Sequence, residues 1–144
     1  HGMPERREIE RRVTRAQPVW KLYTTGSVGS QVLLGLPALE RLRRRFGADC
    51  AVWPFEAWDR PLVLAEVYPS LIDPAVPDAP DAIKDAAQVR LLAAALAGVG
   101  AGRLAAMLED LPATRAVREE EAWILGAGHE AALLAAARRA LAVG

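Results

Sequence analysis

The sequence predicts an α/β domain that contains more helix than strand. The chain has 144 residues, of which 52% are hydrophobic and 25% charged, a balance typical of one folded domain. One nearly continuous apolar run, residues 62–68, is typical of a strand covered on both faces. Most other apolar residues recur at helical spacing. We therefore expect a single α/β domain over residues 4–144, and we interpret residues 1–3 as a tag remnant.

Two helices are predicted ahead of the first strand. Residues 4–16 form a charged segment with a narrow apolar stripe, and Pro4 suits its first turn. A stronger pattern covers residues 28–46, where Pro37 predicts a kink or the start of a new helix. Gly47 is expected to cap its end. The apolar positions of this second pattern are Val28, Val32, Leu33, Leu36, Leu39, Leu42 and Phe46.

Two strands are predicted. Residues 50–53 form a short apolar strand that ends before Pro54, and residues 62–68 form a clearer one that ends before Pro69. Two strands rarely make an independent sheet. A buried strand also needs neighbours on both sides, so we expect further strands from an upstream segment or from another subunit.

Helices are predicted for most of the second half of the chain. Asp81 is placed to cap a helix over residues 82–98, and a shorter helix follows over residues 101–110. The acidic residues 119–121 start or belong to a short helix, and a last alanine-rich helix covers residues 129–142. The segment between the second strand and these helices is expected to be a loop, because it contains Pro74, Pro77 and Pro80.

Charge and cysteine content narrow the classes of function. The formal net charge is zero, with 18 basic and 18 acidic residues, so overall charge does not steer the chain toward nucleic acid or a membrane. No apolar run approaches the roughly 20 residues that span a bilayer. The single cysteine, Cys50, favours a reducing compartment. We therefore expect a cytoplasmic protein with no membrane partner.

The sharpest candidate for a functional residue is Glu66. A carboxylate inside an apolar run is costly unless it is paired, hydrogen-bonded or bound to a metal. Glu66 stands near the carboxyl end of the predicted strand, the edge at which α/β sheets usually bind ligands. Two structural alternatives stay open: an ion pair with a nearby arginine, or a strand-end carboxylate that faces solvent.

A second acidic cluster consists of Glu119, Glu120 and Glu121. Acidic residues in the first turn of a helix are stabilised by the helix dipole, which is a sufficient structural explanation. The functional interpretation places one of these carboxylates beside Glu66, where the two share a divalent cation such as magnesium.

Three further groups have both a functional and a structural interpretation. Lys84, Asp85 and Gln88 form a compact polar group that is either catalytic or a solvated helix face. Residues 24–30 lead into a helix, so the backbone at Ser27, Gly29 and Ser30 can cradle an anion, or the glycines only permit close packing. The arginines at positions 41, 43, 44 and 45 contact phosphates or form a solvated face.

The order of several short motifs resembles a bacterial family of predicted nucleases, domain of unknown function 429. The strand motif that ends in Glu66-Val67-Tyr68-Pro69 is the most telling part. The other segments are Arg7-x-x-Glu10, Gly26 to Gln31, Val52 to Glu56, Ile83 to Gln88 and Glu120 to Gly126.

This resemblance implies a ribonuclease-H-like fold, a mixed sheet flanked by helices, in which carboxylates hold divalent metals for phosphodiester hydrolysis. By position, Glu66 matches the family's strand acid, Arg7 and Glu10 its early helix pair, and Glu120 or Glu121 its late acid. Such domains normally carry a key aspartate on their first strand. The matched segments begin after that strand, so the resemblance also implies that this chain is the C-terminal part of the domain.

Three functions follow from these observations. The leading one is a nuclease or phosphodiesterase-type domain that uses magnesium or manganese and acts on a nucleic acid or nucleotide. The second is a non-catalytic module that binds a nucleotide or anion, or assembles with its own copies or with a missing N-terminal segment. The third, an enzyme of cobalamin or molybdopterin cofactor biosynthesis, rests only on names that some family members carry.

The leading function assigns a role to each candidate residue. The catalytic candidates are Glu66, Glu120, Glu121, Lys84 and Asp85. The expected metal ligands are Glu66, Glu10 and Glu120, and the expected anion-binding residues are Ser27, Gly29, Ser30 and Arg7.

Overall fold

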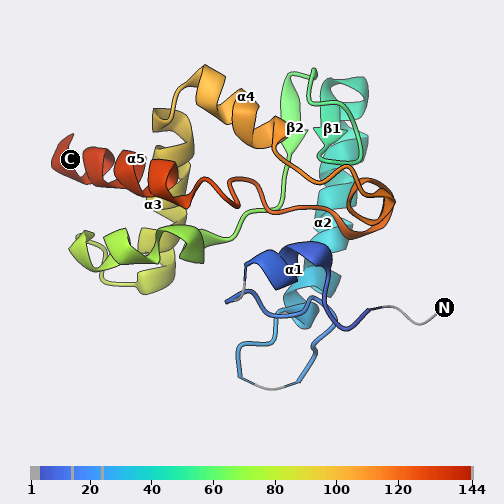
Figure 1. Ribbon diagram of the computed structural model, residues 1–144, viewed down its shortest axis with the longest axis horizontal. Helices are drawn as coiled ribbons and strands as arrows, with labels where there is room; N and C mark the ends of the chain where they lie inside the picture. The colour runs from blue at the N-terminus through green and yellow to red at the C-terminus, as the bar shows by residue number, and fades with distance from the viewer. Residues whose placement is uncertain (1–3, 14, 24, 144) are drawn as a thin grey trace. The chain divides into compact units, whose positions relative to one another are not determined.

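The computed structural model in Figure 1 describes residues 4–13, 15–23 and 25–143. The expected tag remnant, residues 1–3, lies outside the described residues, as do Thr14 and Thr24. The chain forms two compact units, each built from two separate segments. Unit 1 consists of the described residues of His1–Glu66 with Pro112–Trp123, and unit 2 of those of Val67–Leu111 with Ile124–Gly144.

Unit 1 combines helical segments with a small sheet. Its regular elements are α1 (Glu8–Arg12), α2 (Gly29–Phe46), the 3₁₀ helix η1 (Gly47–Asp49), β1 (Cys50–Val52), β2 (Leu62–Leu64) and the π-helical turn η3 (Val117–Glu121). The strands β1 and β2 pair in parallel, with Cys50 opposite Leu62. The buried apolar residues of unit 1 include Ile9, Ala16, Ala51, Trp53, Val117 and Trp123.

The prediction of a ribonuclease-H-like fold with a mixed sheet is wrong. Within the described residues the only sheet has two parallel strands, each three residues long, and the fold is rich in helix. The Trp53 N–H donates to the Leu64 carbonyl at 2.9 Å, and the chain then leaves the extended conformation in a turn that contains Pro54. β2 is half-buried rather than covered on both faces, and Glu66 lies two residues beyond its end.

The first N-terminal helix differs from its predicted bounds, whereas the second matches its predicted range, 28–46, to within one residue. α1 covers only Glu8–Arg12 of the segment 4–16 that we expected to be helical. α2 continues through Pro37, so no new helix begins there. Gly47 follows α2 with a positive φ of 52°, which confirms the predicted glycine at this helix end.

The regular elements assigned in the described part of unit 2 are all helices. Its elements are the proline-rich 3₁₀ segment η2 (Pro69–Asp78), α3 (Lys84–Gly98), α4 (Ala101–Glu109) and α5 (Glu130–Val143). The predicted bounds of α3, α4 and α5 are confirmed to within two residues. The loop expected around Pro74 and Pro77 is instead short 3₁₀ helix. Asp81 does not cap α3, because it pairs with Arg90, their Nη2 and Oδ2 atoms lying 2.6 Å apart.

The core of unit 2 lies where α3, α5 and η2 pack together. Small side chains on α3 and α5 permit this packing, and the buried residues include Ala87, Leu91, Ala95, Leu133, Ala137, Leu71 and Ile72. Figure 1 shows α3 and α5 beside each other.

Within the described residues, no single helix is both long and apolar enough to cross a membrane. The pair α3 and α4 reaches the required length and composition only together, and the two helices are bent by 106° at the break between them.

Candidate functional site

The charged centre of unit 1 is Arg7, which is 5% exposed and lies against Glu10, which is fully buried. Arg7 immediately precedes α1, and its backbone N–H donates to Glu10 Oε2 at 3.0 Å. Its side-chain Nε donates to Glu10 Oε1 at 2.8 Å, and the Val19 N–H donates to the same oxygen at 3.0 Å. Three donors therefore compensate the buried Glu10 carboxylate.

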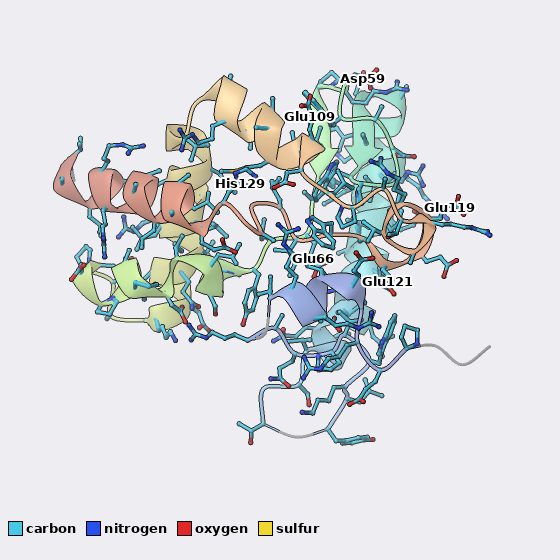
Figure 2. All side chains as sticks on the ribbon, in the orientation of Figure 1. Asp59, Glu66, Glu109, Glu119, Glu121 and His129 are labelled. Atoms are coloured by element: carbon cyan, nitrogen blue, oxygen red, sulfur yellow. The ribbon has the colours of Figure 1, made fainter. Side chains whose placement is uncertain are left out.

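The same guanidinium binds Glu66 through two parallel hydrogen bonds. Nη1 donates to Glu66 Oε2 and Nη2 to Glu66 Oε1, each at 2.8 Å. Nη1 also donates to the backbone carbonyl of Glu121 at 2.9 Å, and the Glu121 carboxylate accepts the Glu8 N–H at 2.6 Å. Arg7 thus joins three segments of unit 1, two of which Figure 2 marks by Glu66 and Glu121.

The electrostatics of this cluster keep the guanidinium charged. Burial by itself lowers the pKa of Arg7, but the hydrogen bonds and negative charges of Glu66 and Glu10 outweigh it, so the pKa is raised above its ordinary value. Arg7 therefore acts as a permanent cation between two carboxylates, and proton transfer is not its role.

Of the expected metal ligands, Glu10 and Glu66 meet on Arg7, whereas Glu120 is exposed on η3. The ion pair that we considered for Glu66 is therefore present. Both Glu66 oxygens accept from Arg7, and the Glu66 side chain is still 35% exposed. Among the described residues, no group of three or more His, Cys, Asp or Glu side chains is placed to hold a metal ion.

Two other catalytic candidates, Lys84 and Asp85, belong to unit 2, whereas Glu66 belongs to unit 1. Both are exposed in the first turn of α3. Their neighbour Gln88 donates to Asp73 Oδ1 at 2.7 Å, a contact within unit 2. These observations favour the structural interpretation of this polar group.

The expected anion site at the start of α2 is occupied by the protein's own backbone. The Gly29 N–H donates to the Lys21 carbonyl at 3.0 Å. A Cβ at Gly29 would lie 2.7 Å from that oxygen and 2.8 Å from the Val19 carbonyl oxygen, so this glycine permits close packing. Of the other predicted members, Ser30 is exposed, Ser27 is half-buried, and Arg7 is engaged by carboxylates.

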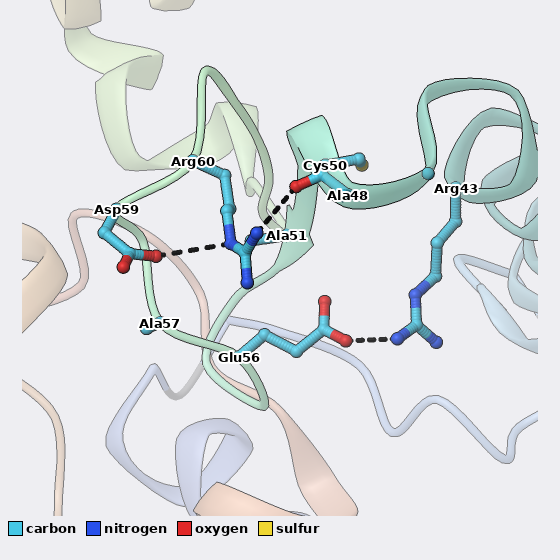
Figure 3. A pocket seen from close by; sticks show the side chains of 9 residues that line it. Arg43, Ala48, Cys50, Ala51, Glu56, Ala57, Asp59 and Arg60 are labelled. Atoms are coloured by element: carbon cyan, nitrogen blue, oxygen red, sulfur yellow. Dashed lines mark hydrogen bonds and ion pairs between the residues drawn. The ribbon is translucent and has the colours of Figure 1, made fainter.

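Sequence reasoning missed a pocket of about 330 Å³ beside β1, shown in Figure 3. Two arginines and two acids line it. Arg43 pairs with Glu56, whose second oxygen accepts the Val52 N–H at 2.8 Å, and Arg60 donates to the Ala48 carbonyl at 2.8 Å. Since these groups compensate one another, the pocket has no net charge that would select an anion or a cation.

The second feature that sequence reasoning missed is the open apolar side of α2. Of its 18 residues only Gly29 is buried. We define the α2 stripe as Val32, Leu36, Leu39, Leu42 and Phe46. Leu36, Leu42 and Phe46 are 54%, 43% and 42% exposed, and the neighbouring Leu33 is 61% exposed. The stripe itself was readable from the helical spacing, but its exposure was not, because an apolar stripe normally faces a core.

No family model matches the chain, and neither a curated protein nor a solved structure matches it. The resemblance to the predicted nucleases therefore stays a prediction.

Proposed function

We propose that this chain is a non-catalytic protein-assembly module in which the α2 stripe binds a protein partner. The observation that carries the proposal is the exposure of Leu36, Leu42 and Phe46 along one side of a regular 18-residue helix. Contiguous exposed apolar residues of this kind commonly mark interaction surfaces, whereas scattered ones do not.

Energetics favour a partner on α2. Fully burying a Leu or Phe side chain contributes about 1.5–3 kcal/mol, and Leu36, Leu42 and Phe46 still have about half of that to gain, whereas Val32 and Leu39 are already half-buried. An isolated helix of about this length is only marginally stable in water, and most helices in proteins are stabilised by packing against other segments. Since Gly29 is the only fully buried residue of α2 and Val32 and Leu39 are half-buried, a partner would add support to this helix.

The charges of α2 favour a protein partner over nucleic acid. Arg43 pairs with Glu56 and Arg44 with Glu40, so two of the four arginines near the end of α2 are already compensated. The chain as a whole has no net charge. A nucleic-acid surface would instead need clustered free cations, because phosphate contacts supply most of its affinity.

Thiol protection in cells tests this proposal without requiring that the partner be known. The natural Cys50 is buried but lines the pocket beside β1, so the labelled variants also carry Cys50→Ser. Leu36→Cys should react slowly with a cell-permeant maleimide in the cells that make the protein. The matched variant Arg41→Cys, about 140° around the helix, should react quickly in the same cells. Equal reactivity of the two variants in cells would contradict the proposal.

The second candidate function is metal-assisted phosphodiester hydrolysis, which one observation favours: the carboxylates of Glu10 and Glu66 and the backbone carbonyl of Glu121 come from three segments and all contact Arg7. Magnesium or manganese would have to compete with Arg7 for Glu66. Calorimetric titration with each metal, and a phosphodiesterase assay, should then show signals that Glu66→Gln abolishes. Unchanged signals in Glu66→Gln would contradict this candidate function.

For either function we propose a cytoplasmic location, which the single cysteine supports.

A further inference from the structure

We propose that the partner of the α2 stripe is a second copy of this chain, bound antiparallel about a two-fold axis that passes by Leu39. This inference rests on the assembly function proposed above and names its partner. It is supported by three properties of α2: the spacing of the stripe, the distribution of charge, and an open position at Gly35.

The spacing of the α2 stripe is symmetric about Leu39. Its members follow one another at steps of four, three, three and four residues. A two-fold axis at Leu39 therefore brings Val32 of one copy opposite Phe46 of the other, and Leu36 opposite Leu42, while Leu39 meets its own counterpart. A two-fold interface uses the same patch on both copies, so it requires such self-complementarity.

The charges of α2 select the antiparallel arrangement. Residues 29–39 carry no charge, whereas residues 40–45 contain four arginines and one glutamate. Antiparallel pairing places the arginines of each copy beside the uncharged half of the other, for example Arg43 opposite Gly35. Parallel pairing would bring the two arginine clusters together, which like-charge repulsion disfavours.

Gly35 provides room for a side chain of the second copy. It lies on the side of the helix that carries the stripe, between the directions of Leu42 and Phe46. Beyond the neighbouring backbone of its own helix, a Cβ built at Gly35 meets no heavy atom within 4 Å. The surface there is open, so two α2 helices can approach closely at this point.

An interface made by one helix of each copy is small, so we expect a weak dimer with a dissociation constant of about 1–100 μM. Sedimentation equilibrium of the intact chain from about 1 to 500 μM should show a monomer–dimer equilibrium. Leu36→Asp should raise the dissociation constant at least about tenfold, because both copies would place the charged side chain in the two-fold interface. The matched control is Leu34→Asp, which is 79% exposed on the other side of α2 and should leave the equilibrium unchanged.

Cysteine cross-linking tests the arrangement. In the antiparallel dimer, Leu39→Cys meets its own counterpart and should form a disulfide-linked dimer on oxidation, whereas Leu36→Cys faces Leu42 and should not. Efficient cross-linking of Leu36→Cys together with Leu39→Cys would indicate parallel helices and overturn the inference. Circular dichroism confirms that each variant is folded.

The inference and the proposed function fail under different results. A chain that stays monomeric up to the highest concentration, or dimerises equally well with Leu36→Asp and Leu34→Asp, overturns the second copy as the partner. If Leu36→Cys is nevertheless protected in cells, the assembly function stands with a different partner.

Discussion

At the scale of single residues, Arg7 connects the buried charged groups of unit 1. One guanidinium compensates Glu10, which has no exposed surface, and holds Glu66 and the Glu121 backbone from two distant segments. A buried ion pair stabilises a protein only when its geometry and its remaining hydrogen bonds compensate the loss of water. The paired hydrogen bonds at 2.8 Å and the three donors to Glu10 meet that condition.

Replacing Arg7 should therefore destabilise the protein strongly. Arg7→Met leaves the Glu10 carboxylate buried without its cation, and we expect a loss of about 3–5 kcal/mol in the free energy of unfolding, measured with urea. Arg44→Met is the control, because its surface pair with Glu40 contributes about 0–1 kcal/mol. Similar losses in both variants would contradict the role assigned to Arg7.

In unit 2, a surface pair predicts how one carboxyl titrates. The hydrogen bonds from Arg90 lower the pKa of Asp81. A carboxyl with a lower pKa in the folded state stabilises the fold above its ordinary pKa, and the contribution is lost as the pH falls through the folded value. Titration followed by NMR should show the Asp81 pKa rising in Arg90→Gln. An unchanged pKa would show that the pair does not form in solution.

At the scale of elements, helices could be predicted better than strands. The helical spacing and the glycines and prolines between segments locate α3, α4 and α5 because these signals are local. Strand length depends on pairing with a neighbour, which a single segment does not reveal. The run 62–68 therefore predicted a strand reaching Glu66, whereas pairing with β1 ends at Leu64.

Sequence patterns likewise predicted only part of the candidate site, because they report local features and not tertiary contacts. Glu66 stood out because it interrupts an apolar run, and an arginine partner was one of its predicted alternatives. That the partner is Arg7, 59 residues away, depends on tertiary structure. The exposure of the α2 stripe depends likewise on which segments fail to cover it, and no local pattern reports that.

Two glycines of α2 give opposite predictions for the same substitution. Gly29→Ala places a Cβ 2.7 Å from a backbone oxygen, so we expect a loss of about 1–3 kcal/mol. Gly35→Ala meets open space inside a helix, so it should gain about 0.5–1 kcal/mol through helix propensity. Thermal unfolding of the dilute chain measures both. A stabilising Gly29→Ala would contradict the close packing described for the start of α2.

At the scale of the whole molecule, the two units differ in how they are stabilised. Unit 2 has an apolar core between α3, α5 and η2. Unit 1 combines a two-stranded sheet with buried charges and leaves most of α2 open to solvent. A local sequence pattern does not reveal this division, because each unit joins segments that are distant in the chain.

Hydrogen exchange of the intact chain tests most directly whether α2 lacks a partner within its own fold. In the dilute chain, amides of α2 (Gly29–Phe46) should exchange at least about tenfold faster than those of α3 (Lys84–Gly98), because α3 buries four residues and α2 only one. Raising the protein concentration should slow exchange in α2 and leave α3 unchanged. Protection of α2 equal to that of α3 in the dilute chain would contradict the account, because the helix would then be stable without a partner.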